Sequence, residues 1–188
     1  MGKDTQPQKT RNSTVLKTQI SRMFSSGGVV CKNDNGVVLW LVRQTVASDL
    51  YPKQYWMLPK GWIDDAGPGI PGPIASGKIK ADEESLQNTA LREVAEEGGV
   101  VSKIIKKLGT SLFTYTDPKF GKVLKFVTFY LMEYVSDLPD GHDGETSEVL
   151  WLPFDEAKKK LSFSSEKEML EKAKAEGKGF EPLITLRL

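Results

Sequence analysis

Short runs of apolar residues separated by turn-forming residues make up most of the chain, and this pattern predicts a protein rich in β-strands. Two runs, 28–31 and 37–42, flank residues 32–36, where an Asn-Gly step favours a hairpin turn. A third short strand is predicted over 55–58, and residues 100–116 are expected to form one or two strands. The remaining strands are expected at 123–133, after a turn at 117–122, and at 148–153.

A helical pattern interrupts the strands once, before residue 100. Its apolar face consists of Leu86, Ala90, Leu91 and Val94. Ser85 is the expected N-cap, and Gly98 and Gly99 are expected to end the helix. Two more helices are predicted, one over 154–161 and one that begins at Ser164. Strands, a helix, strands and terminal helices together predict an α+β protein in which a mixed sheet lies between helices, an α/β/α sandwich.

Composition adds the domain organisation and the expected compartment. With 188 residues, 39% of them hydrophobic and 27% charged, the chain is expected to form one soluble domain over 21–188 after a flexible, polar tail at 1–20. The net charge of +1 gives no general attraction to nucleic acid or to a membrane, and we expect neither as a partner. The single cysteine, Cys31, excludes an internal disulfide and favours a cytoplasmic protein. Monomer and homodimer both stay open.

Three carboxylates lie beside the apolar face of the first predicted helix. Glu93, Glu96 and Glu97 fall within about 100° of arc, and Arg92 is placed to orient one of them. Hard oxygen donors without neighbouring Cys or His suit Mg²⁺ or Mn²⁺. The alternative is a solvated helix face, although like charges at this spacing cost a few tenths of a kcal/mol each.

The same stretch resembles a known motif. Residues 92–100 match the second half of the Nudix box, Arg-Glu-U-x-Glu-Glu-x-Gly-U with U aliphatic, at every fixed position, and Glu84 stands eight residues before Arg92 as the box requires. The box glycine is identified as Gly61, within Leu-Pro-Lys-Gly-Trp, in preference to Gly77. Gly61 lies 23 residues before Glu84 where the box has 6, so the motif carries an insertion of 17 residues.

The inserted stretch is a Gly- and Pro-rich loop over 66–80, a composition that disfavours the interior of a helix or strand. Two interpretations stay open. The loop is either a lid over the substrate or a surface excursion, which costs little free energy.

The resemblance implies a Nudix fold and metal-dependent hydrolysis of a diphosphate linkage. Arg92 would orient a ligand carboxylate, and a glutamate near the end of the 123–133 strand, Glu133, would face the metal cluster. The expected ligands of Mg²⁺ or Mn²⁺ are Gly61, Glu93, Glu96 and Glu97. The candidates for the catalytic base are Glu97, Glu133, Glu145 and Glu148.

The substrate is expected to be a small nucleoside polyphosphate. Residues 58–61, 125–130 and the C-terminal part resemble diadenosine polyphosphate hydrolases, which implies a dinucleoside polyphosphate such as diadenosine tetraphosphate. Lys60, Lys125 and Trp62 are the expected substrate-binding residues, with lysines serving as point charges toward phosphates. The alternatives are a diphosphoinositol polyphosphate hydrolase and a Nudix module that senses a nucleotide without cleaving it.

Overall fold

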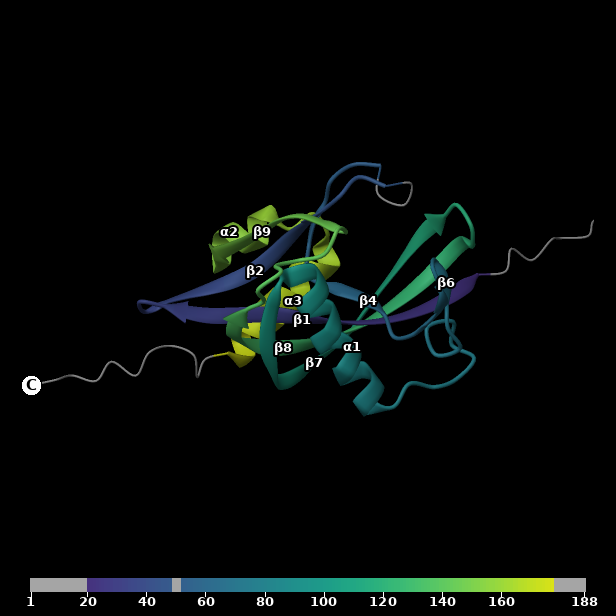
Figure 1. Ribbon diagram of the computed structural model, residues 1–188, viewed down its shortest axis with the longest axis horizontal. Coiled ribbons are helices and arrows are strands. Elements are labelled where there is room, and N and C mark those ends of the chain that lie inside the picture. The colour runs from purple at the N-terminus through teal and green to yellow at the C-terminus, as the bar shows by residue number, and fades with distance from the viewer. Residues whose placement is uncertain (1–19, 49–51, 178–188) are drawn as a thin grey trace, which may run out of the picture.

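A seven-stranded mixed sheet forms the centre of the protein in the computed structural model, which describes residues 20–48 and 52–177 (Figure 1). Its main path runs β3-β2-β1-β8-β7, with β4 paired to β1 and β9 paired to β2. The strands are β1 (Ser21–Asp34), β2 (Val37–Thr45), β3 (Trp56–Met57), β4 (Lys60–Trp62), β7 (Val100–Asp117), β8 (Gly121–Asp137) and β9 (Thr146–Pro153). The helices are α1 (Glu83–Gly98), α2 (Phe154–Lys160) and α3 (Ser164–Glu176).

The pairing of β1 with β8 makes the sheet mixed, because these two strands are parallel while the other paired strands are antiparallel. The predicted hairpin between β1 and β2 is confirmed. Asn35 and Gly36 both have positive φ, 51° and 90°, as a two-residue turn of this kind requires. None of the described helices is long and apolar enough to cross a membrane.

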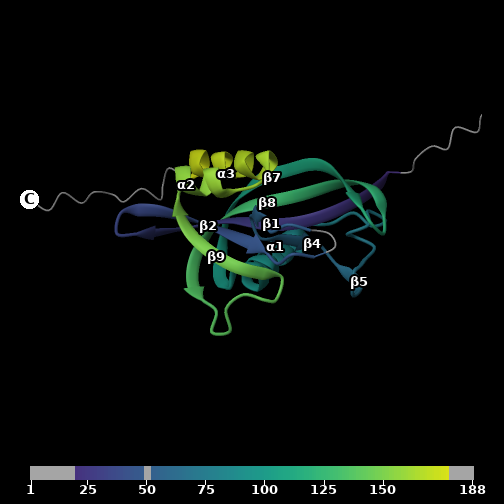
Figure 2. The same cartoon turned by 90° about the horizontal axis from the view of Figure 1, so that it is seen from above.

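Helices cover both faces of the sheet, which confirms the predicted sandwich (Figure 2). Successive residues of β8 point to opposite faces. Phe129 and Leu131 pack in the core beneath α2 and α3, whereas Tyr130 and Met132 pack against α1. The predicted apolar face of α1, which includes Ala90, lies in this second core.

Two elements differ from the prediction, and a third resolves an open alternative. Helix α1 starts earlier than expected, because Asp82 is the N-cap and its carboxylate accepts a hydrogen bond from the Ser85 N–H at 2.7 Å. Residues 100–116 form one strand, β7, the first of the two predicted alternatives, and its register against β8 shifts at three places. The inserted stretch contains a small hairpin of β5 (Asp65–Gly67) and β6 (Ile70–Pro71), so it is not without strand.

The carboxyl end of α1 is fixed by a glycine and by a docked loop. Gly99 is left-handed at φ +67°, and its N–H donates to the Ala95 carbonyl at 3.0 Å, which confirms the predicted helix stop. The loop between β8 and β9 returns to this end: the Leu138 N–H donates to the Gly99 carbonyl at 2.8 Å and the Asp143 N–H to the Glu96 carbonyl at 2.7 Å. These bonds hold the acidic loop beside the carboxylates of α1.

Replacing Gly99 with Ala is expected to destabilise the protein by more than about 1 kcal/mol, because φ is positive and a Cβ would lie 2.8 Å from the His142 backbone nitrogen. Gly98→Ala is the matched control, since Gly98 is helical and a Cβ there meets Leu41 only at 3.4 Å. Urea denaturation of both variants measures the difference. Equal loss of stability in the two would show that the left-handed conformation is not the cause.

Candidate active site

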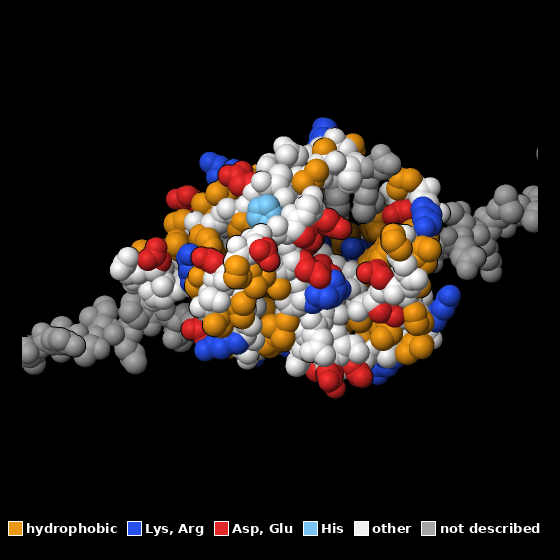
Figure 3. Space-filling view, in the orientation of Figure 1, with side chains coloured by type: hydrophobic (Ala, Val, Ile, Leu, Met, Phe, Trp, Pro, Cys, Tyr) orange, Lys and Arg blue, Asp and Glu red, His pale blue; other side chains and the backbone are white. Residues whose placement is uncertain are grey.

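The three glutamates of α1 lie on one side of the helix but differ in burial. Glu93 and Glu97 are buried, whereas the Glu96 side chain is exposed. Strand β4 passes beside the two buried carboxylates. In Figure 3, acidic side chains gather beside a hollow on the face that α1 covers.

Glu97 joins three elements of the fold. Its Oε2 accepts a hydrogen bond from the Lys60 N–H of β4 at 2.7 Å, and its Oε1 pairs with the guanidinium of Arg43 on β2. Its carbonyl accepts a hydrogen bond from the Thr146 hydroxyl at 2.9 Å. Glu97 therefore fixes α1 against β2, β4 and β9.

Glu93 lies against the glycine that the sequence identified as the box glycine. A Cβ at Gly61 would stand 2.1 Å from Glu93 Oε1, so any other residue at this position of β4 would displace the Glu93 carboxylate. Arg92 holds Glu93 Oε1 and Glu96 Oε2, each at 2.7 Å, and it also donates to the Trp62 carbonyl at 2.9 Å. The structure thus places Arg92 where it orients two carboxylates.

Burial raises the pKa of Glu93 to about 7. The negative charges of Glu96 and Glu145 also raise it, while the Arg92 guanidinium lowers it. The single guanidinium therefore does not offset the cost of burying this carboxylate. A bound cation would offset it.

The donors fit a divalent ion in type and place, because buried carboxylate oxygens stand beside the backbone of a glycine whose missing side chain leaves room for them. Within residues 20–48 and 52–177, however, no three Asp, Glu, His or Cys side chains are grouped closely enough to hold one ion. The cause is visible in the ion pairs, because Arg92 engages Glu93 and Glu96 while Arg43 engages Glu97. The expected convergence of all three carboxylates is therefore not present in this conformation.

Of the four candidate bases, two lie at this cluster. Glu97 is one, and Glu145 is the other, because its charge acts on Glu93 and its carbonyl accepts from Arg43 Nη1 at 3.3 Å. Glu133 does not join them. It shares the α2 and α3 side of the sheet with Leu131 and pairs with Lys103 at 2.7 Å. Glu148 is exposed on β9, beside Gln44 in the strand register.

Two buried charged residues of the site were missed by the sequence reasoning. Arg43 follows the apolar run of β2, and only the alternation of that strand could have indicated that it faces α1 with Leu41. Glu166 is in the first turn of α3, and its carboxylate accepts from the Leu58 N–H at 2.8 Å and pairs with Lys60 Nζ at 2.7 Å. Glu166 lies four residues before Leu170 and seven before Ala173, so the helical spacing of these apolar residues could have indicated that it faces the core.

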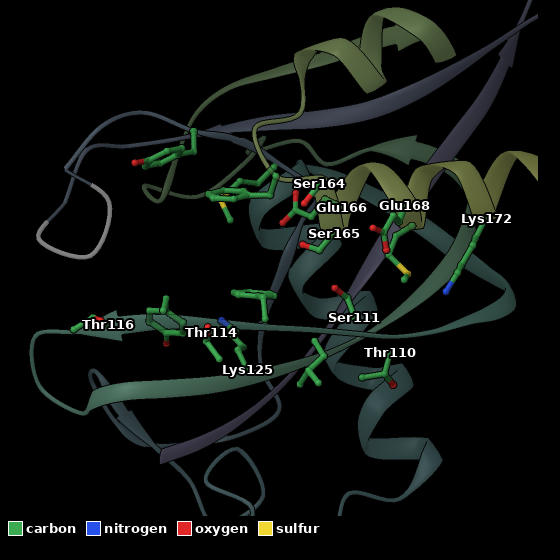
Figure 4. Close-up of a pocket in the computed structure, with 17 residues that line it drawn as sticks. Thr110, Ser111, Thr114, Thr116, Lys125, Ser164, Ser165, Glu166, Glu168 and Lys172 are labelled. Carbon is green, nitrogen blue, oxygen red and sulfur yellow. The ribbon is translucent and has the colours of Figure 1, made fainter. Parts of the chain in front are cut away.

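A cavity of about 560 Å³ opens between α3 and the strands β7 and β8 (Figure 4). Figure 4 shows Ser164, Ser165 and Glu166 on one side and Ser111 and Lys125 on the other. Aromatic side chains line the cavity in two pairs, with Tyr55 5.3 Å from Phe163 and Phe113 6.3 Å from Tyr115 between ring centroids.

Two of the three expected substrate-binding residues differ from expectation in their contacts. The Lys60 ammonium is buried and already paired with Glu166, and Trp62 lies outside the cavity, with its ring edge against Phe120. Lys125 lines the cavity and makes no ion pair with the described residues. Burial and the nearby Lys60 charge lower the pKa of Lys125 to about 8, against the opposing effect of Glu93.

The sequence profile of the NUDIX domain matches residues 22–173. The chain belongs to the Nudix hydrolase family. A protein of Mycobacterium tuberculosis that carries the name mutator protein MutT4 is 30% identical over 166 residues, which cover 87% of this chain; the chain spans only 57% of that relative's length.

Solved structures show the same fold. An Ap4A hydrolase of C. elegans, in a binary complex, has 21% identity and a TM-score of 0.55 over 84% of this chain and 99% of its own. The Nudix domain of Shewanella oneidensis NrtR, in complex with ADP ribose, has 22% identity and a TM-score of 0.57 over 86% of this chain and 92% of its own. At these identities the likeness extends to the fold alone.

Removing the Arg43 guanidinium is expected to destabilise the protein strongly. Arg43→Met leaves the buried Glu97 carboxylate without its cation, which typically costs about 3–5 kcal/mol. The matched control is Lys103→Met, which breaks the exposed pair with Glu133 and is expected to cost at most about 1 kcal/mol. Urea denaturation measures both. Similar losses in the two variants would contradict the importance assigned to burial.

The metal-free protein is expected to lose stability as the pH rises from about 4.5 to about 7. Between these values folded Glu93 keeps a proton that the unfolded chain has released, so unfolding becomes easier with increasing pH. Glu93→Gln should abolish this fall, and Glu96→Gln, at an exposed position, should keep most of it. The free energy of unfolding in chelator at pH 5 and pH 8 provides the comparison; an unchanged fall in Glu93→Gln would refute the assignment.

Proposed function

We propose that this protein hydrolyses a diphosphate linkage in a nucleoside polyphosphate with the help of Mg²⁺ or Mn²⁺, and that its substrate is a dinucleoside polyphosphate such as diadenosine tetraphosphate. The observation that carries the proposal is the position of Lys60. Its backbone N–H binds Glu97, beside the other carboxylates, and its ammonium binds Glu166, which lines the cavity. One residue therefore connects the carboxylates of α1 with a cavity suited to a nucleotide.

The cavity supports a nucleotide by its size and lining. Its volume of about 560 Å³ lies within the range of small-molecule pockets, and its paired aromatic rings offer faces against which a base can stack. Lys125 supplies a positive charge without a partner on the described protein, so its ammonium is suited to a phosphate group. The negative charge of Glu93 raises the pKa of Lys125, so this lysine interacts electrostatically with a carboxylate of α1.

The residues that would hold the metal are Gly61, through its carbonyl, and Glu93, Glu96 and Glu97. A bound divalent ion neutralises phosphate charge and lowers the pKa of water. Arg92 orients Glu93 and Glu96, and Arg43 pairs with Glu97 and holds it in place. Glu97 and Glu145 are the two candidates for the group that accepts the proton of the attacking water. Catalysis of this kind depends mainly on positioning and charge stabilisation.

The first test is product analysis after incubation with diadenosine tetraphosphate and Mg²⁺. The wild-type protein is expected to release ATP and AMP. Glu97→Gln should lower the rate by a factor on the order of 10²–10³, because it removes a carboxylate from the site. Glu133→Gln is the matched control and should keep near-wild-type activity, since Glu133 pairs with Lys103 on the other side of the sheet.

The outcomes separate the alternatives. A loss of activity in Glu133→Gln as large as that in Glu97→Gln would contradict the placement of the site. Cleavage of a diphosphoinositol polyphosphate in place of the adenine nucleotide would identify the other hydrolase class, and adenine nucleotides would then fail to compete. Binding of a nucleotide without turnover at any divalent metal concentration would identify a sensor.

A further inference from the structure

The inserted segment is anchored by one side chain. The carboxylate of Asp64 accepts hydrogen bonds from the Ala75 N–H at 2.6 Å and the Ile74 N–H at 3.2 Å, and the Asp64 carbonyl accepts one from the Gly72 N–H at 3.1 Å. A Cβ at Gly72 would lie 2.3 Å from the Asp64 carboxylate, so a side chain at this position would displace the carboxylate from its hydrogen bonds. The middle of the inserted segment is therefore bound to a residue two positions before its beginning.

The segment is also packed into the fold. Ala75 is fully buried, and its carbonyl accepts from the Phe24 N–H of β1 at 2.8 Å. Gly77, at φ +73°, lies against the Phe24 ring, which stacks on Phe126 with 4.8 Å between centroids. These contacts are those of a structural element, and they do not favour a lid that opens and closes.

The two residues before Asp64 hold the catalytic helix. The Ile63 carbonyl accepts from the Thr89 hydroxyl at 3.1 Å, and the Trp62 carbonyl accepts from Arg92 at 2.9 Å. Arg92 in turn binds Glu93 and Glu96. Three consecutive residues thus connect the inserted segment with the guanidinium that orients the carboxylates.

We propose that Asp64 is a positioning residue: it binds the inserted segment to the peptide units that hold α1, and it thereby sets the orientation of Arg92, Glu93 and Glu96. The inference rests on the proposed metal-dependent function. Groups that orient metal ligands from outside typically change metal affinity by 10–100-fold when they are removed. The segment 66–80 then has a structural role, because it stabilises the residues that orient the carboxylates of the site.

The test compares Asp64→Ala with Lys119→Ala in the full chain. Asp64→Ala is expected to lower the affinity for Mn²⁺, measured by calorimetry without substrate, by about 10-fold. It should also speed hydrogen exchange at the Ile74 and Ala75 amides and lower kcat more than it changes KM. Lys119→Ala removes the contact of Lys119 Nζ with the Gly69 carbonyl, 2.9 Å, at the tip of the hairpin, and its contact with the Phe120 ring, 5.4 Å from the centroid, and should leave the Mn²⁺ affinity unchanged.

Thr89→Val provides a second route if Asp64→Ala does not fold. It breaks the bond to the Ile63 carbonyl from the helix side. The Mn²⁺ affinity should fall while exchange at Ile74 and Ala75 stays slow. The inference would be overturned if Asp64→Ala folds, exchanges fast at these amides and still binds Mn²⁺ with unchanged affinity. Unchanged Mn²⁺ affinity in Thr89→Val would overturn it as well.

If the wild-type protein binds no Mn²⁺, the proposed metal-dependent function is wrong, and the positioning role of Asp64 is tested without metal. In that case the NMR signals of the Arg92 guanidinium decide the positioning role. A shift of these signals in Asp64→Ala, absent in Lys119→Ala, supports it, and unchanged signals overturn it.

Discussion

The buried carboxylate of Glu97 is the constraint on which the site depends. An ionised carboxylate is costly to bury, and here the cost is offset by the Arg43 guanidinium and by the Lys60 N–H. These partners come from β2 and β4, and neither strand alone determines the position of α1. Because one carboxylate must reach both, the helix has little freedom to rotate or slide. The same contact that stabilises the fold therefore fixes the position of Glu93, one turn away on the same face.

Buried charged residues extend from this contact through the sheet to the layer formed by α3. Lys60 binds Glu97 with its backbone on the α1 side and Glu166 with its ammonium on the α3 side, and Glu166 also binds the Leu58 N–H. The buried cations Arg43 and Lys60 thus alternate with the buried anions Glu97 and Glu166. Lys125 and Lys172 line the cavity beside this arrangement, and Lys125 is the residue for which we propose a phosphate contact.

The sequence predicted what is determined by local patterns. The hairpin turn at Asn35 and Gly36 follows from backbone preferences, and the alternation of strands and helices indicated the sandwich. The spacing of residues 92–100 placed Arg92 and Glu93 on one helix, and Gly61 proved to be the glycine that lies against Glu93. These inferences needed only short-range geometry or a motif.

The remaining features depend on which face of a strand meets which helix. Alternation places Glu133 on the same side as Leu131, but the sequence does not say that α1 covers the opposite side. Periodicity could indicate the buried faces of Arg43 and Glu166, but it does not indicate their partners. Glu97 for Arg43, and Leu58 and Lys60 for Glu166, lie more than 50 residues away in the chain. The same holds for Asp64, whose partners lie across the insertion.

The insertion itself shows why a motif can be interrupted without losing its site. The Nudix box is a set of contacts in space, and the contact of Gly61 with Glu93 does not require six residues between Gly61 and Glu84. Extending that connection from 6 to 23 residues costs only about 1 kcal/mol of loop-closure entropy. Two backbone N–H groups bonded to the Asp64 carboxylate offset a cost of this size, since hydrogen bonds to charged groups contribute about 1.5–3 kcal/mol each. The chain therefore leaves the box at Asp64 and returns to α1 at Asp82 with both ends held, and the geometry of the motif is preserved.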